Sequence, residues 1–173
     1  MKLLEIINDE EQNVKHISGN IHSLLPRIRD VARWDASILL WQEIKLSELG
    51  QIKAAIELAV EGWASNFGLP MAAKATKKQG ASDNNGERAG VAVQVKKELH
   101  SVRVASSPET IELRHEGRWE ERAISCGNGK QQLIAASMYG VDGASSCTDK
   151  YKRNEDQIAK ACIRMLEVGD VPY

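Results

Sequence analysis

The sequence lacks the features that mark membrane, fibrous or strongly cationic proteins. It has one phenylalanine, 5% aromatic residues and four prolines, and its 23 basic residues are balanced by 24 acidic ones. No apolar run approaches the roughly 20 residues that a membrane-spanning helix needs, so we expect no membrane partner. A net charge of −1 argues against a generally cationic nucleic-acid binder, although a local basic groove is compatible with it. What is present, 42% hydrophobic and 27% charged residues over 173 positions, is typical of a globular domain with a sizeable core.

Cysteine is also scarce. Cys126, Cys147 and Cys162 are odd in number and show no metal-ligand spacing, which favours free thiols in a reducing compartment. A cysteine nucleophile is the alternative, but no histidine stands nearby to activate one. The first residues, MKLLEIINDEEQ, are too acidic and too short in apolar residues for a signal peptide. We therefore expect a cytoplasmic or nuclear protein that is not secreted.

The periodicity of the chain predicts an α/β protein with residues 1–12 as an N-terminal extension and residues 13–173 as one domain. Helices are expected at 24–34, after Ser23, at 48–61, between Ser47 and Gly62, and at 149–168. In the second of these, Ile52, Ile56 and Val60 recur at helical spacing. Strands are expected at 13–20, 36–41, 63–67, 90–95, 99–105, 110–114, 118–126 and 131–139. Alternation of strand and helix followed by a run of strands predicts an α/β sandwich.

One stretch lies outside this regular pattern. The stretch 69–88 is rich in lysine, glycine and asparagine and is predicted to be a loop. Its basic residues suit either a cationic rim for phosphate groups or a solvated loop; they are Lys74, Lys77, Lys78 and Arg88. The glycines of this stretch do not form a phosphate-binding loop, because no Gly-Lys-Ser/Thr follows a strand.

Polar residues close two of the predicted strands. Asn20 ends the first, and Gln42 and Glu43 follow the apolar run Ile38–Trp41. If these strands are parallel neighbours joined by the helix between them, Asn20 and Glu43 lie side by side at the edge where α/β sheets bind ligands. A carboxylate there suits Mg²⁺. From these residues alone, Glu43 is equally well explained as a cap of the following turn or a partner of Lys45.

The order of these and later motifs resembles the endonuclease/exonuclease/phosphatase superfamily, the DNase I-like phosphodiesterases. The similar pieces, in order, are ISGN ending at Asn20, ILLWQE ending at Glu43, GVAVQV at 90–95, WEERAIS with Arg122, LIAASMYG with Tyr139, and a last helix with Arg153-Asn154-Glu155. The residues from Gly19 to Leu46 are most similar to endonuclease domains of retroelement polyproteins. The resemblance implies half of a DNase I-like α/β/β/α sandwich, with a mixed sheet and helices on one face.

The resemblance also implies roles for individual residues. Glu43 matches the metal-binding glutamate, and Asn20 the asparagine that orients metal and phosphate. Tyr139 matches a tyrosine that contacts the scissile phosphate. Arg122 matches an arginine that supports the site, and Arg118 competes with it for the same register. The implied cofactor is Mg²⁺, with Mn²⁺ as an alternative, and the implied partner is nucleic acid.

The Gly-Asp-x-Asn and Ser-Asp-His motifs of the family's second half have no counterpart in this sequence. The chain therefore resembles the N-terminal half, and none of His16, His22, His100 and His115 stands in the context of the family's catalytic histidine. We expect weak metal binding, negligible hydrolysis by this chain alone, and self-association through an uncovered apolar sheet face, which carries either Val91, Val93, Ile134 and Ala136 or the residues that alternate with them on the opposite face. Two functions stay open: a metal-dependent phosphodiesterase domain, and a non-catalytic interaction module of the same fold.

Overall fold

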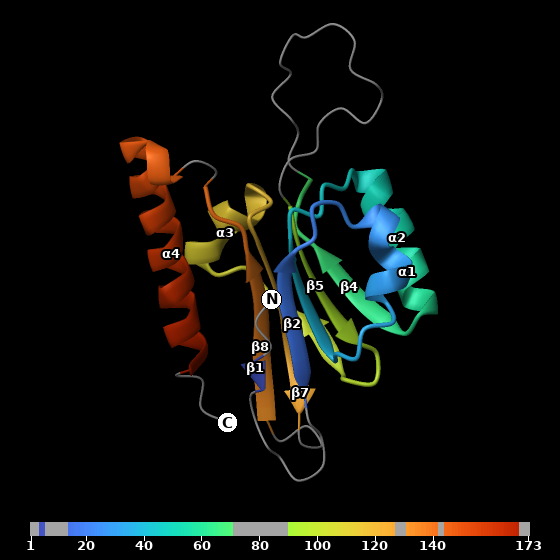
Figure 1. Cartoon of the computed structure of the whole chain (residues 1–173). Coiled ribbons are helices and arrows are strands. Elements are labelled where there is room, and N and C mark those ends of the chain that lie inside the picture. The colour runs from blue at the N-terminus through green and yellow to red at the C-terminus, as the bar shows by residue number, and fades with distance from the viewer. Residues whose placement is uncertain (1–3, 6–13, 71–89, 127–130, 142–143, 170–173) are drawn as a thin grey trace, which may run out of the picture.

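The computed structural model describes residues 4–5, 14–70, 90–126, 131–141 and 144–169. They form two β-sheets and four α-helices (Figure 1). The strands are β1 (Leu4–Glu5), β2 (Lys15–Asn20), β3 (Ile38–Gln42), β4 (Trp63–Phe67), β5 (Val91–Lys96), β6 (Ser101–Arg103), β7 (Trp119–Cys126) and β8 (Gln131–Met138). The helices are α1 (Ile28–Val31), preceded by a 3₁₀ turn at Leu25–Arg27, α2 (Glu48–Val60), α3 (Pro108–His115) and α4 (Thr148–Gly169). A further 3₁₀ turn spans Ala144–Ser146.

The first sheet has five strands in the order β1-β2-β3-β5-β4, and the second has three in the order β6-β7-β8. Only β2 and β3 are parallel, with Asn20 paired to Gln42; every other described pairing is antiparallel. The predicted mixed sheet is therefore confirmed. A parallel pair needs a crossover connection, and the segment with α1 supplies it.

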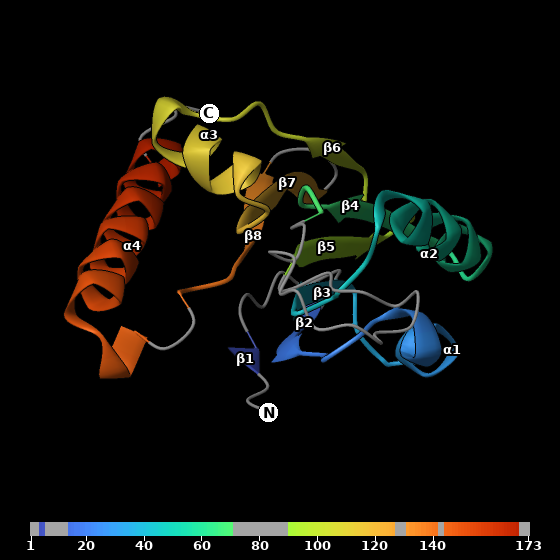
Figure 2. The same ribbon diagram turned by 90° about the horizontal axis from the view of Figure 1, so that it is seen from above.

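The two sheets pack face to face with helices on their outer sides. β8 contacts β3 and β5, and β7 contacts β4 and β5. Seen from above, α1 and α2 cover the outer face of the first sheet, while α3 and α4 lie outside the second (Figure 2). This is the α/β/β/α layering expected from the sequence.

The strand predicted at residues 110–114 is wrong, because these residues belong to the helix α3. Ser107 Oγ accepts a hydrogen bond from the backbone N–H of Thr110, and the Thr110 hydroxyl accepts one from the backbone N–H of Ser107. Pro108 occupies the first helical turn, where its missing N–H costs nothing. This reciprocal cap starts a helix where the apolar residues Ile111 and Leu113 alone suggested alternation.

The core lies between the sheets and beneath α1 and α2. Val91 and Val93 are fully buried, and Ile134 and Ala136 are half-buried; of the residues that alternate with them, Ala92, Gln94 and Ala135 are buried. The expectation that one of these two sets is uncovered is therefore wrong. None of the described helices is both long enough and apolar enough to cross a membrane. The lysine-rich stretch 71–89 lies outside the described residues.

Candidate active site

The carboxyl ends of β2 and β3 bring Asn20, His22 and Glu43 together. Pairing continues past the strands, because Ile21 N–H donates to the Gln42 carbonyl over 3.0 Å and Leu24 N–H donates to the Ile44 carbonyl over 3.1 Å. These two bonds flank His22 on one loop and Glu43 on the other. The two side chains are thereby held opposite each other at the sheet edge.

Four neighbours surround the Glu43 carboxylate, whose side chain is 16% exposed. Tyr139 donates its hydroxyl to Oε1 over 3.0 Å, and the Asn20 amide also hydrogen-bonds the carboxylate. Oε2 lies 2.6 Å from His22 Nδ1 and 3.6 Å from Lys45 Nζ. Burial by itself raises the pKa of Glu43, but the hydrogen bonds and the two nitrogen contacts outweigh it and hold the pKa below its ordinary value. Glu43 is therefore ionised at neutral pH.

Asn20 links the two loops. Its Oδ1 accepts a hydrogen bond from the backbone N–H of His22 over 3.0 Å, while its amide contacts Glu43. The predicted neighbourhood of Asn20 and Glu43 is thus present in the structure. Asn20 therefore hydrogen-bonds to both His22 and Glu43.

The backbone of these two loops is strained. His22, Ser23, Glu43 and Lys45 have φ values of 62°, 149°, 54° and 48°, and no other described non-glycine residue has a positive φ. Side chains with a Cβ rarely adopt such angles, which cost about 1–3 kcal/mol each and concentrate at functional sites. Gly90 accommodates the loop of β3, since a Cβ on it would lie 2.9 Å from Ile44 Cγ1.

Tyr139 reaches Glu43 from the second sheet. Ser137, two residues earlier, donates its hydroxyl to the Trp41 carbonyl over 2.8 Å and so fixes β8 against β3. The guanidinium of Arg118 lies 5.6 Å from the centre of the Tyr139 ring and donates to the carbonyls of Tyr139 and Gly140. Arg118 therefore contacts both the ring and the backbone carbonyl of Tyr139, while the Tyr139 hydroxyl is bound to Glu43.

The structure does not bring Arg122 to this group. Its guanidinium donates to Asn66 Oδ1 over 2.6 Å and to the Ser101 hydroxyl and carbonyl, each over 3.0 Å. Arg122 stands four residues along β7 from Arg118, about 13 Å at the usual rise of a strand. Of the two arginines that competed for the register, Arg118 is the one beside Tyr139.

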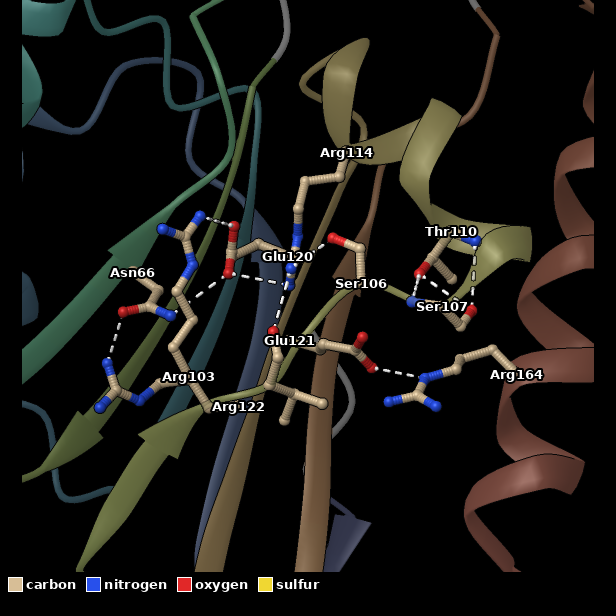
Figure 3. A network of polar contacts seen from close by, with 11 residues as sticks. Asn66, Arg103, Ser106, Ser107, Thr110, Arg114, Glu120, Glu121, Arg122 and Arg164 are labelled. Atoms are coloured by element: carbon tan, nitrogen blue, oxygen red, sulfur yellow. Dashed lines mark hydrogen bonds and ion pairs between the residues drawn. The ribbon is translucent and has the colours of Figure 1, made fainter.

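Arg122 belongs instead to a buried polar network between the sheets (Figure 3). At its centre Glu120, fully buried, meets Arg103 over 3.4 Å, Arg114 over 3.3 Å and Asn66 over 3.2 Å. Such a network is costly unless its charges are paired, and here the arginines pair the carboxylate. Its position points to a structural role in holding β4, β6, β7 and α3 together.

Sequence reasoning missed His22 and left open which of Arg118 and Arg122 belongs to the site. His22 is two residues past Asn20, and its approach to Glu43 depends on the left-handed backbone of both loops, which no sequence pattern signals. Arg118 faces Tyr139 because the hairpin pairs Trp119 with Met138. The Asn128-Gly129 turn signal could have indicated that register, since a two-residue turn at these positions leads by antiparallel counting to the same pairing.

The donors at this edge fit part of a divalent-metal site. Glu43 Oε2 is buried, and its close described neighbour is His22 Nδ1 at 2.6 Å, which does not approach it with regular hydrogen-bond geometry. Such an oxygen is unfavourable unless a cation or water satisfies it. Two atoms bound side by side to one ion at about 2.1 Å lie about 3 Å apart, which is close to the 2.6 Å between Oε2 and His22 Nδ1. Lys45, 36% exposed, can turn away into solvent.

The ligand set is nevertheless incomplete among the described residues, which contain no group of three or more His, Cys, Asp and Glu side chains able to hold a metal ion. One carboxylate, one imidazole and one amide are what this edge offers. They are suited to weak binding of a cation.

Solved nuclease structures have a similar arrangement of strands and helices. The 3′–5′ exonuclease NExo of Neisseria meningitidis matches with a TM-score of 0.50 and 20% identity, over 84% of this chain and 49% of its own. The chain has half of a DNase I-like fold. The AP endonuclease LMAP of Leishmania major has a TM-score of 0.48 and 20% identity, over 79% of this chain and 44% of its own. The catalytic domain of Xenopus laevis APE2 has a TM-score of 0.48 and 18% identity, over 84% and 50%.

This DNase I-like chain spans about half the length of the solved structures it matches. No protein-family model and no curated protein matches its sequence. At 20% identity the likeness to the exonuclease establishes the fold alone, so the chemistry of the DNase I-like half has to be argued from its own residues.

Proposed function

We propose that this chain provides the metal-binding part of a phosphodiesterase that acts on nucleic acid. The observation that carries the proposal is the ionised Glu43 carboxylate, held at a strand edge with one buried oxygen that lacks an aligned donor. The DNase I-like fold supports it, because the exonuclease that shares this fold acts on nucleic acid, as its name states. The protein would then work in the cytoplasm or nucleus, without a membrane.

Each residue of the site has a role in this proposal. Glu43 and His22 bind the cation, and Asn20 holds both of them in place. Tyr139 directs its hydroxyl at the Glu43 carboxylate, and from there it would be placed to donate to a phosphate oxygen. Arg118 is a positioning residue, because it contacts Tyr139 and not the cation. A bound divalent ion would act as a Lewis acid on a phosphate oxygen.

Mg²⁺ is the proposed cofactor, and Mn²⁺ is expected to bind more tightly in isolation. Mg²⁺ prefers oxygen ligands and keeps much of its water, whereas an imidazole nitrogen favours later first-row ions. His22 therefore shifts the preference toward Mn²⁺. Because the described residues supply only part of a metal site, hydrolysis by this chain alone is expected to be negligible.

Mn²⁺ binding to the purified chain tests the proposal. Electron paramagnetic resonance measures free Mn²⁺ in the presence of the wild type, Glu43→Gln, His22→Ala and Glu98→Gln. We expect Glu43→Gln to weaken binding at least ~10-fold, since a charged ligand is lost. Glu98 is an exposed acid that follows the end of β5 opposite to the one paired with Gln42, so its variant is the matched control and should bind as the wild type does.

The outcome separates the two functions that the sequence left open. Equal Mn²⁺ affinity in the wild type and Glu43→Gln would reject the metal site and favour a non-catalytic module of this fold. Metal-dependent cleavage of a DNA duplex or single strand by the chain alone, abolished in Glu43→Gln, would keep the site but reject the expected inactivity.

A further inference from the structure

The helix α2 has two apolar faces, and only one of them is used inside the protein. Gly50, Ala54 and Leu58 are buried against the first sheet and the turn before α1. On the opposite face, Leu49, Ile52, Ile56 and Val60 are 61%, 54%, 61% and 80% exposed. These four residues, which we call the outer stripe, follow one another at intervals of three and four and so line a single face. A contiguous exposed apolar face of this kind marks an interaction surface.

The flank of the outer stripe carries one charge of each sign. Lys53 and Glu57 are exposed and lie on the same side of the stripe. Among the residues that the structure describes, neither has an ion-pair partner. The other flank carries Ala55 and Ala59, whose small side chains let a second helix approach closely.

This pattern is complementary to itself. We propose that the outer stripe of α2 binds the outer stripe of a second copy of this chain, with the two helices antiparallel about a two-fold axis. Reversing the stripe places Leu49 opposite the second copy's Val60, and Ile52 opposite the second copy's Ile56. The same reversal places Lys53 opposite the second copy's Glu57, and the axis repeats that pair. Two ion pairs therefore border an apolar centre.

The size of the helix sets the strength of the contact. The thirteen residues of α2 span about 20 Å. One face of a helix of this length offers less surface than the ~800 Å² per partner that stable interfaces bury. The dimer is therefore expected to be reversible and to form only as the protein concentration rises. It uses the outer side of the first sheet's helix layer, whereas the Glu43 site lies at the strand edge, so dimer formation and metal binding are independent.

Sedimentation velocity over about 1 to 500 µM protein measures the association, because mass action controls the dimer fraction. Ile56→Asp should weaken the dimer at least ~30-fold, since it buries a charge at the centre of the contact. Met165→Asp is the matched control: Met165 is 70% exposed on α4, and the same change there should leave the association unaltered. Thermal melting of each variant shows whether it folds.

A charge exchange tests the antiparallel arrangement. Lys53→Glu alone should weaken the dimer about 5- to 10-fold, because both ion pairs become repulsive. The double variant Lys53→Glu/Glu57→Lys restores both pairs and should return to within about 2-fold of the wild type. A wild type that stays monomeric at the highest concentration overturns the proposal. So does a dimer that Met165→Asp disrupts, or one in which the double variant is as weak as the single one.

Discussion

The turn after Tyr139 depends on a close approach between Gly140 and Asn154 of α4. Asn154 Oδ1 accepts a hydrogen bond from the Val141 N–H over 3.0 Å, and a Cβ on Gly140 would lie only 2.6 Å from this same oxygen. Gly140 does not have a positive φ, so its backbone conformation is open to alanine. The contact between the new Cβ and Asn154 Oδ1 is then what opposes the substitution. Gly140→Ala must push the amide away and break its hydrogen bond.

The cost can be worked out from these contacts. Overpacking costs about 1–3 kcal/mol and a lost hydrogen bond about 0.5–1.5 kcal/mol; because the Asn154 amide is the end of a side chain and can turn away, Gly140→Ala should destabilise near the low end of their sum, by about 2 kcal/mol. Asn154→Ala loses only the bond and should cost about 1 kcal/mol. In the double variant the clash is gone, and the alanine lowers the entropy of the unfolded chain. The double variant should therefore be no less stable than Asn154→Ala.

Urea unfolding followed by tryptophan fluorescence measures these free energies, since Trp41, Trp63 and Trp119 are buried. A melting curve gives a second reading, with about 2–4 °C expected per kcal/mol for a chain of this size. The reasoning is refuted if the costs of the two single variants add in the double variant, because that would mean the two positions do not touch.

Three further changes test other parts of the fold. Because the pKa of Glu43 is lowered in the folded protein, its interactions stabilise the fold at pH values above its ordinary pKa of 4.5 and are lost as the pH falls through the folded pKa. The difference in unfolding free energy between the wild type and Glu43→Gln, measured in urea, should therefore shrink from pH 7 to about pH 3. Glu120→Gln should cost about 3–5 kcal/mol by calorimetry, since it leaves Arg114 in a buried site without its carboxylate. Leu58→Ala should cost about 2–5 kcal/mol, whereas Ile56→Ala in the monomer should stay within about 0.5 kcal/mol; equal costs would mean that α2 is oriented differently.

Most of the fold that could be predicted from the sequence came from the periodicity of the strands and from the polar residues at their ends. The buried run before Gln42, the parallel crossover and the closing Asn20 are visible in the sequence, and together they place Asn20 beside Glu43. Periodicity also located α2 and α4, but it did not tell which side of each helix faces the core. In α2, Gly50, Ala54 and Leu58 pack inward while the residues of the outer stripe point outward, and α4 contacts its neighbours through polar residues such as Lys160 and Arg164 as well as through Ala161.

The part of the site that sequence reasoning did not predict depends on conformation. His22 approaches Glu43 because both loops adopt left-handed angles, and Arg118 replaces Arg122 beside Tyr139 because of the hairpin register. The approach of His22 to Glu43 is not encoded by residue type at a fixed spacing, whereas the hairpin register follows from the Asn128-Gly129 turn signal. The strand predicted at 110–114 failed for a different reason: the Ser107 cap and Pro108 were present in the sequence and favour a helix start.

The left-handed residues at the site have a consequence for how stability is distributed over this protein. Replacing Lys45 by glycine relieves a strained angle, so the variant should unfold less readily even though it loses a cation beside Glu43. The same relief lets the loop sample other conformations, and its amide hydrogens should exchange faster with solvent. Selection for a more stable chain and selection for a fixed His22–Glu43 geometry therefore act in opposite directions on these few residues.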